Sequence, residues 1–98
     1  MYEIEYTLQA VEDLKFFKKY EQKQILDGIS IQLRYEPTVE TRNRKRMRPN
    51  QIADWELRLG KFRIFYNIDE QVLIVEIQRI GEKRGSDFFF HDEQEDMR

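Results

Sequence analysis

Charged side chains of both signs gather in one short stretch of the sequence, residues 55–66, where apolar and polar residues alternate. Alternation on both sides of Gly60 is typical of two half-buried strands joined by a tight turn, and glycine at that place suits a type II′ turn. Such a turn sets Arg58 directly opposite Arg63, on the same face as Glu56. Like charges in direct opposition destabilise a strand pair, so this pairing points to an anion on the polar face of the hairpin.

A third strand is predicted to continue this face. A turn at Asp69-Glu70, with a loop of two or four residues, pairs Arg63 with Glu76. The polar row then runs Arg58, Arg63, Glu76 across three strands. The opposite face of the hairpin is predicted to be the core face, with Trp55, Leu57, Leu59, Phe62, Ile64 and Tyr66.

The composition predicts one globular domain over residues 1–98. Hydrophobic residues make up 40% of the chain and include seven Phe, which is enough for one core. No apolar run approaches the roughly 18 residues of a membrane span, and no leader is recognisable, so we expect a cytoplasmic protein without membrane contact. The absence of Cys and the single His exclude an ordinary zinc site within one chain. We expect neither a metal nor a cofactor.

The net charge of −2 is unevenly distributed along the chain. It is −2 over residues 1–33, +5 over 34–63 and −5 over 64–98. A basic middle segment suggests an anionic partner for one surface, although charge runs are more often solvated loops. Pro37 and Pro49 bracket a segment without apolar periodicity, which predicts a loop. The cations of this loop are Arg42, Arg44, Lys45, Arg46 and Arg48.

The remaining elements follow from periodicity and capping. Residues 2–6 alternate and predict a strand, Thr7 is predicted to cap a first helix, and a second helix is predicted over about 21–34. Residues 81–86 are turn-like and 87–91 form an aromatic segment before a charged tail. The predicted fold is α+β: an N-terminal strand and a two-helix hairpin on a mainly antiparallel four-stranded sheet, in the order β-α-α-β-β-β. The apolar positions of the helices are Leu8, Val11, Leu14 and Phe17 in the first, and Ile25, Ile29 and Leu33 in the second.

These segments together resemble the RelE/ParE superfamily of bacterial type II toxin–antitoxin toxins. The resemblance rests on the paired helices, the hairpin Leu-Arg-Leu-Gly-x-Phe-Arg-x-x-Tyr at residues 57–66, the buried third strand, and the Ile80-Gly81-x-Lys83-Arg84 turn. It covers nearly the whole chain. It implies a small toxin that a co-expressed antitoxin neutralises by wrapping it. RelE-like members cleave mRNA in the ribosomal A site without a metal, whereas ParE-like members inhibit DNA gyrase.

The resemblance assigns cationic roles by position. Arg63 falls on the hairpin arginine that contacts the scissile phosphate in RelE-like enzymes. Arg58 falls on the second of two lysines in the preceding strand, while the first is replaced here by Glu56. Lys83, or Arg84 beside it, falls near a cation that stabilises the developing charge.

Proton transfer is the point at which this sequence departs from RelE itself. The C-terminal tyrosine of RelE falls at about Phe89, which cannot transfer a proton. Relatives use a glutamate and a C-terminal histidine, and this chain offers Glu56 or Glu76 as the base and His91 as the acid. Phe65, on the same face, is expected to stack an RNA base.

Each of these assignments has a structural alternative. The carboxylates can form ordinary salt bridges with the arginines, His91 can be a tail residue, and the cations of the 38–48 loop can either hold ribosomal RNA phosphates or solvate the loop. Three functions therefore stay open: a ribosome-dependent endoribonuclease, a gyrase inhibitor, and an attenuated homologue that only binds its antitoxin. The expected partners are the cognate antitoxin, the ribosome and mRNA, and operator DNA only through the antitoxin.

Overall fold

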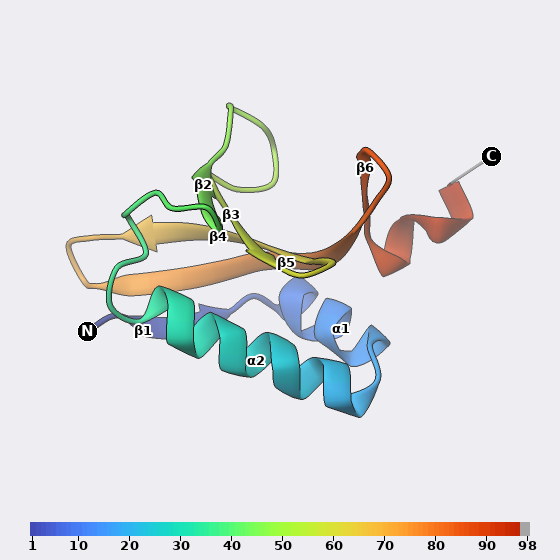
Figure 1. The fold of residues 1–98 in the computed structure, drawn as a ribbon, viewed down its shortest axis with the longest axis horizontal. Helices are drawn as coiled ribbons and strands as arrows, with labels where there is room; N and C mark the ends of the chain where they lie inside the picture. The colour runs from blue at the N-terminus through green and yellow to red at the C-terminus, as the bar shows by residue number, and fades with distance from the viewer. Residues whose placement is uncertain (97–98) are drawn as a thin grey trace.

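Two helices cover one face of a six-stranded sheet in the computed structural model (Figure 1), which describes the backbone of residues 1–96 and the side chains through Glu93. The elements are β1 (Glu3–Tyr6), α1 (Leu8–Phe16), α2 (Lys19–Leu33), β2 (Arg44–Arg46), β3 (Trp55–Leu59), β4 (Phe62–Asp69), β5 (Ile74–Arg84), β6 (Asp87–Phe89) and the 3-10 helix η1 (His91–Asp96). No helix within residues 1–96 is long and apolar enough to cross a membrane.

The sheet confirms the α+β class but has two more strands than predicted. Its order is β1-β5-β4-β3-β2, with β1 parallel to β5 and the other pairs antiparallel, and β6 pairs with the end of β5. The extra strand β2 comes from the predicted basic loop. It escaped prediction because Arg44 is buried there through hydrogen bonds rather than apolar contacts. The extra strand β6 follows a turn at Gly85-Ser86, since residues 81–84 continue β5 instead of turning.

The β2 edge of the sheet is closed by the segment just before it. The Arg44 carbonyl accepts a hydrogen bond from the Thr41 amide at 2.9 Å, and the Thr41 hydroxyl accepts one from the Arg44 amide at 3.2 Å. The Arg46 amide donates to a carboxylate oxygen of Glu40 at 2.9 Å. These outward-facing backbone groups are therefore satisfied within the chain.

The β3–β4 hairpin has the predicted register. Leu59 lies opposite Phe62 and Arg58 opposite Arg63, and Gly60 has a φ of +57°. A positive φ at the first loop residue is what a type II′ turn requires, and glycine adopts it without strain.

The predicted β4–β5 register is wrong. Arg63 lies opposite Gly81, and Glu76 lies opposite Asn67. The shift has two causes. The loop lies at residues 70–73, after Asp69, and is not centred on Asp69-Glu70 as predicted, and a register irregularity occurs between residues 65 and 66.

The helices are held differently from one another. Thr7 caps α1 as predicted, because its hydroxyl accepts a hydrogen bond from the Ala10 amide at 3.0 Å. The same hydroxyl donates to the Gln78 carbonyl of β5 at 3.0 Å and so ties the start of α1 to β5. In this position Asp13 is buried, whereas Leu8 is not. Leu8 is 76% exposed, contrary to the predicted stripe. In α2 the predicted Ile25, Ile29 and Leu33 are all buried.

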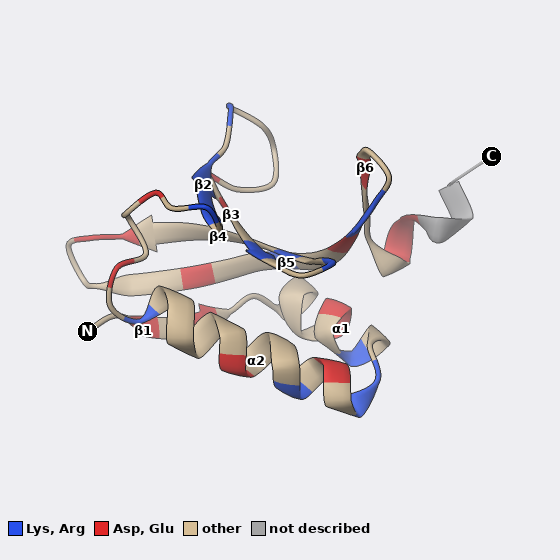
Figure 2. Cartoon of the chain, viewed as in Figure 1, with Lys and Arg blue, Asp and Glu red and all other residues tan. Residues whose placement is uncertain are grey.

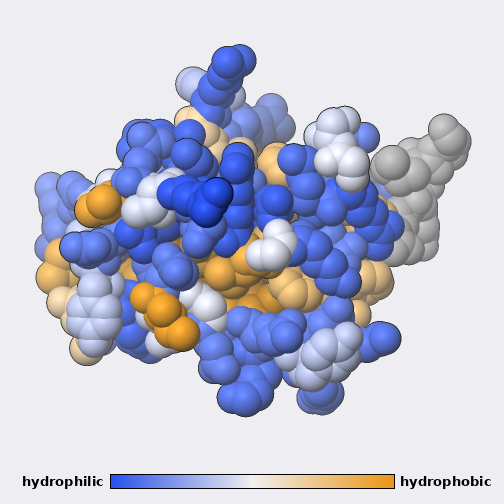
Figure 3. Space-filling view, viewed as in Figure 1, coloured by the Kyte–Doolittle hydropathy of each residue, from blue (hydrophilic) through white to orange (hydrophobic). Residues whose placement is uncertain are grey.

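Apolar residues pack on both faces of the sheet. The main core lies between the helices and the sheet and includes all the predicted core-face residues of the hairpin, with Leu59 only partly buried. A smaller cluster lies on the other face, where Phe65 packs with Ala53 and Phe90. Figure 3 shows apolar surface in a band between α2 and the strands.

Candidate nucleic-acid interface

The sheet face that points away from the helices carries the candidate site. We call it the outer face. Strand alternation and pairing place on it Arg79, which lies opposite Phe65, and a row of further side chains from β2 to the segment after β6. They are Lys45, Glu56, Arg58, Arg63, Phe65, Lys83, Phe88 and Phe90.

A buried carboxylate lies at the centre of the cationic part of this face. The Oε2 atom of Glu56 lies 3.3 Å from Nε of Arg58 and 3.2 Å from Nε of Arg63, and Lys45 is its cross-strand neighbour. The repulsion between the two guanidinium groups is thus reduced by the Glu56 carboxylate, which lies near both. Arg58 remains 45% exposed, whereas Glu56 and Arg63 are largely covered.

The Arg63 guanidinium is fixed by the hairpin turn. Its Nη1 atom donates to the Gly60 carbonyl at 2.5 Å and to the Phe62 carbonyl at 2.9 Å. Its buried Nε has no hydrogen bond among the described residues, because its approach to Glu56 lacks hydrogen-bond geometry. The turn therefore holds this cation in one orientation before any ligand arrives.

Two expected members of the site lie elsewhere. Glu76 lies opposite Asn67, four residues along β4 from its predicted partner Arg63, and its Oε1 accepts a hydrogen bond from Nε2 of Gln78 at 2.6 Å. Phe65 is fully buried and cannot stack on a base in this structure. Its ring lies under Phe88, with ring centres 5.0 Å apart, so Phe88 is the aromatic exposed at this place.

The two cations near the end of β5 point to opposite faces. Lys83 is on the outer face, where its Nζ lies 5.8 Å from the centre of the Phe88 ring. Arg84 is on the helix side: it lies over Phe89 at 3.6 Å, and its Nε is 2.9 Å from Oε1 of Glu82. Of this pair, Lys83 alone shares the face of Glu56.

The predicted basic loop divides into structural and exposed cations. Arg44 is buried and donates to the Val39 carbonyl at 2.9 Å and to the carbonyl and side chain of Gln32 at 3.0 and 2.9 Å. It therefore ties β2 to α2. Figure 2 shows the other basic residues of this region on β2, on the segment before it and on the loop that follows it. Lys45 is half-buried, and the exposed ones are Arg42, Arg46 and Arg48.

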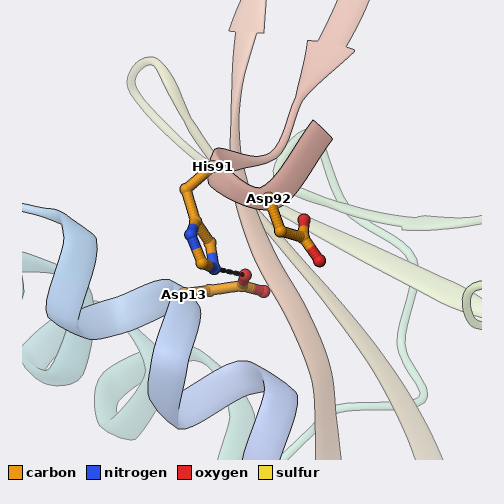
Figure 4. Close-up of side chains that lie close together, drawn as sticks. All are labelled: Asp13, His91 and Asp92. Atoms are coloured by element: carbon orange, nitrogen blue, oxygen red, sulfur yellow. Dashed lines mark ion pairs between the residues drawn. The ribbon is translucent and has the colours of Figure 1, made fainter. Parts of the chain in front are cut away.

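His91 belongs to a separate charged network. Its Nε2 lies 3.0 Å from Oδ1 of Asp13 in α1 (Figure 4), and its ring stacks on Phe16 with ring centres 5.6 Å apart. Its ion pair is with Asp13 and not with the arginines of the outer face. The structure therefore does not bring the expected acid to the expected phosphate site.

Sequence reasoning missed Asp13 and its partner Arg79. Asp13 has no exposed surface and accepts hydrogen bonds from Nε and Nη2 of Arg79 at 2.8 and 3.0 Å and from the Ile80 amide at 2.9 Å. One signal was available: Asp13 follows Ala10 by three residues and precedes Phe17 by four, which is the spacing of the buried side of a helix. A carboxylate at such a position needs a buried partner.

Asp13, His91 and Asp92 could supply metal ligands, since their ligand atoms lie within 4.8 Å of one another. However, the Arg79 guanidinium binds both carboxylates, with its Nη2 2.7 Å from Oδ1 of Asp92. A second cation there would be repelled by this guanidinium. The hydrogen bond that Arg79 donates to Asp92 lowers the pKa of Asp92, and the hydrogen bonds that Arg79 donates to Asp13 raise the pKa of Arg79. The network therefore fits an internal ion cluster better than a metal site.

Asp92→Asn is expected to lower stability slightly at neutral pH and to have no effect in acid. Because Arg79 lowers the pKa of Asp92 from its ordinary 3.8, the ionised carboxylate stabilises the fold above that value, and this contribution is lost as pH falls through the folded-state pKa. The measurement is the urea midpoint of both proteins from pH 3 to 7, with Glu93→Gln as the control. A difference that stays constant down to pH 3 would contradict the Arg79 contact.

Comparison with known proteins agrees with this fold. Several solved structures share it at low sequence identity. The RelBE2 toxin–antitoxin complex of Mycobacterium tuberculosis gives a TM-score of 0.70 at 24% identity over 84% of this chain and 98% of that one. The archaeal RelE–RelB complex of Pyrococcus horikoshii OT3 gives 0.68 at 23% over 88% and 98%. The isolated E. coli RelE toxin gives 0.69 at 17% over 89% of each chain.

The sequence itself carries the family assignment. A search of curated proteins finds no significant match. A family model for the ParE toxin of the type II toxin–antitoxin system parDE, however, matches residues 4–86. This span runs from β1 to the turn after β5 and includes both helices and the Glu56 cluster. The chain therefore belongs to the ParE toxin family of type II toxin–antitoxin systems, within the RelE/ParE superfamily.

Proposed function

We propose that this toxin arrests translation by cleaving mRNA on the ribosome and that a cognate antitoxin neutralises it. The observation that carries the proposal is the Glu56 carboxylate set between two guanidinium groups on the outer face. Three of the solved neighbours are RelE-type toxins bound to their antitoxins, which supports the antitoxin partner.

The chemistry uses the cluster as a phosphate site with an adjacent base. Glu56 accepts the proton of a ribose 2′-hydroxyl, whose oxygen attacks the neighbouring phosphorus and displaces the 5′-oxygen. Arg58 meets the phosphate first because its side chain is exposed, and the fixed Arg63 stabilises the extra negative charge of the pentavalent phosphorane. The products are a 2′,3′-cyclic phosphate and a 5′-hydroxyl.

The leaving 5′-oxygen takes its proton from a group on the same face. Lys83 is the candidate because it shares that face, whereas His91 is bound to Asp13 and would have to leave it. Lys83→Ala is therefore expected to slow cleavage more than His91→Gln does.

The test is inducible expression in bacteria with separate pulse labelling of protein and DNA synthesis, followed by mapping of mRNA ends. Wild type should stop protein synthesis alone. Arg58→Ala and Glu56→Gln should each lower the cleavage rate by about 100-fold or more, while Lys23→Ala, an exposed cation on α2, should not. If the Glu56→Gln variant cleaves mRNA at the wild-type rate, Glu56 is not the general base.

A second function, inhibition of DNA gyrase, is favoured by one observation. Both arginines already pair with Glu56, and His91 is held by Asp13, so these contacts can be purely structural. In that case expression should stop DNA synthesis while protein synthesis continues, and the Arg58 and Glu56 variants should stay toxic if folded.

A further inference from the structure

We infer that Lys61 is a positioning residue, which holds the β3–β4 turn from the helix side and thereby orients two cations of the outer face. The inference rests on the phosphate site proposed above. Lys61 is the second residue of the turn, and its Nζ lies 3.2 Å from Oε2 of Glu21 in α2 and 3.5 Å from Oε2 of Glu82 in β5. We call these three side chains the turn bridge.

The backbone of the turn holds Arg63 and Lys83. The Gly60 and Phe62 carbonyls, on either side of Lys61, accept the hydrogen bonds from Nη1 of Arg63. The Lys61 carbonyl accepts a hydrogen bond from the Lys83 amide at 2.9 Å. A movement of the turn therefore moves the Arg63 guanidinium and the backbone of Lys83 with it.

The strands alone restrain this turn in only one direction. Hydrogen bonds between antiparallel strands lie in the plane of the sheet, so they resist sliding of the strands but offer little resistance when the end of a hairpin bends out of that plane. The turn bridge acts across this plane, because Glu21 belongs to the helix layer under the sheet. It therefore restrains the movement that the strand hydrogen bonds leave free.

Both carboxylates of the turn bridge are fixed within their own elements. The Oε1 atom of Glu21 accepts the Lys18 amide at 3.1 Å and so caps α2, and Oε1 of Glu82 lies 2.9 Å from Nε of Arg84. Each carboxylate side chain is 12% exposed. The Lys18 amide is the main cause that lowers the pKa of Glu21, and Glu21 raises the pKa of Lys61. The bridge is therefore charged throughout the neutral pH range.

Loss of the bridge should slow cleavage without weakening RNA binding. Arg58, which meets the phosphate first, takes no hydrogen bond from the turn carbonyls, whereas Arg63 acts on the phosphorane. A shift of about 1 Å in a group that stabilises the transition state can cost roughly 100-fold in rate. We expect Lys61→Met to lower kcat by about 10- to 100-fold, with KM unchanged.

The experiment combines cleavage of mRNA on purified ribosomes with NMR of the full-length toxin, freed of antitoxin. Lys61→Met removes the charge but keeps an apolar chain near the Phe62 ring, from which Nζ lies 5.4 Å away. The Nε atom of Arg63 is buried, so its proton should exchange slowly and give a separate ¹⁵N signal, assigned by its loss in Arg63→Lys. Its heteronuclear NOE should fall in Lys61→Met and be restored, together with kcat, in Lys61→Arg.

The matched control is Lys23→Met, which removes the same charge from an exposed ion pair on α2. It should leave both kcat and the Arg63 NOE unchanged. Urea midpoints of all variants show whether each is folded at the assay temperature.

Three outcomes would overturn the inference. One is an unchanged Arg63 NOE in folded Lys61→Met. Another is an equal fall of kcat in Lys61→Met and Lys23→Met, which would make the effect one of total charge. The third is a loss in Lys61→Arg as large as that in Lys61→Met. If wild type cleaves no mRNA but the Arg63 NOE falls in Lys61→Met alone, the positioning role stands and only the nuclease is rejected.

Discussion

Asp13→Asn is expected to destabilise the fold by about 3–5 kcal/mol, the cost of removing one partner from a buried ion pair. The substitution keeps the size of the side chain but removes the charge that satisfies Arg79, the Ile80 amide and His91. The side-chain oxygen of an asparagine can still accept hydrogen bonds here, but its NH₂ group would face N–H donors of Arg79 or Ile80 and could not bond to them. Because a small domain is stable by only about 5–15 kcal/mol, this loss is a large share of the total.

Urea unfolding, followed by the fluorescence of buried Trp55, measures this cost. The control is Asp27→Asn, which removes an exposed carboxylate paired with Lys23 on α2 and should change stability by less than about 0.5 kcal/mol. If the two variants unfold at the same urea concentration, the Asp13 network contributes no more than a surface ion pair.

Gly81→Ala is the second substitution with a large expected effect, about 1–3 kcal/mol of destabilisation. A Cβ at this position would lie 2.5 Å from the Phe89 carbonyl oxygen and 2.9 Å from the Phe90 ring. The carbonyl belongs to the backbone of β6, so it cannot rotate away, and the C-terminal segment has to shift. We therefore also expect amide exchange of residues 87–90 to increase more than that of β3.

Gly28→Ala is the matched control for this effect. A Cβ at Gly28 would also come within 2.5 Å of an atom, but that atom is the end of the flexible Leu59 side chain. Alanine in a helix interior gains roughly 0.5–1 kcal/mol over glycine, which offsets the repacking. A larger loss for Gly28→Ala than for Gly81→Ala would show that the C-terminal segment adapts more easily than α2.

The sequence predicted those parts of the fold that neighbouring residues determine. The register of β3 and β4 follows from one glycine turn, and the Thr7 cap and the buried face of α2 follow from local spacing. The β4–β5 register depends on an irregularity at residues 65 and 66 inside a strand, for which no turn residue gives a signal. Strand β2 depends on Arg44 reaching Gln32 of α2, a contact between distant segments.

In the candidate site, too, the sequence predicted what neighbouring residues determine and missed what depends on contacts between distant segments. The placement of Glu56, Arg58 and Arg63 on one face followed from the hairpin alone. The burial of Phe65 and the pairing of His91 with Asp13 arise because the C-terminal segment folds back onto the sheet and α1. Periodicity within a strand or a helix does not show that the C-terminal segment folds back over the sheet. Phe65 was therefore predicted to be exposed, whereas in the structure it is buried and Phe88 is exposed.

The closed edge at β2 limits how other chains can join this sheet. An unpaired edge strand is a template for another strand and so for aggregation or domain exchange. Here Thr41 already bonds the amide and the carbonyl of Arg44, and the Glu40 carboxylate bonds the Arg46 amide. A protein that binds at this side therefore finds few free backbone groups and meets exposed side chains such as Arg42 and Arg46. If antitoxins bind at this edge, the toxin would distinguish between them by the arrangement of charges that face these arginines, and single substitutions can change that arrangement.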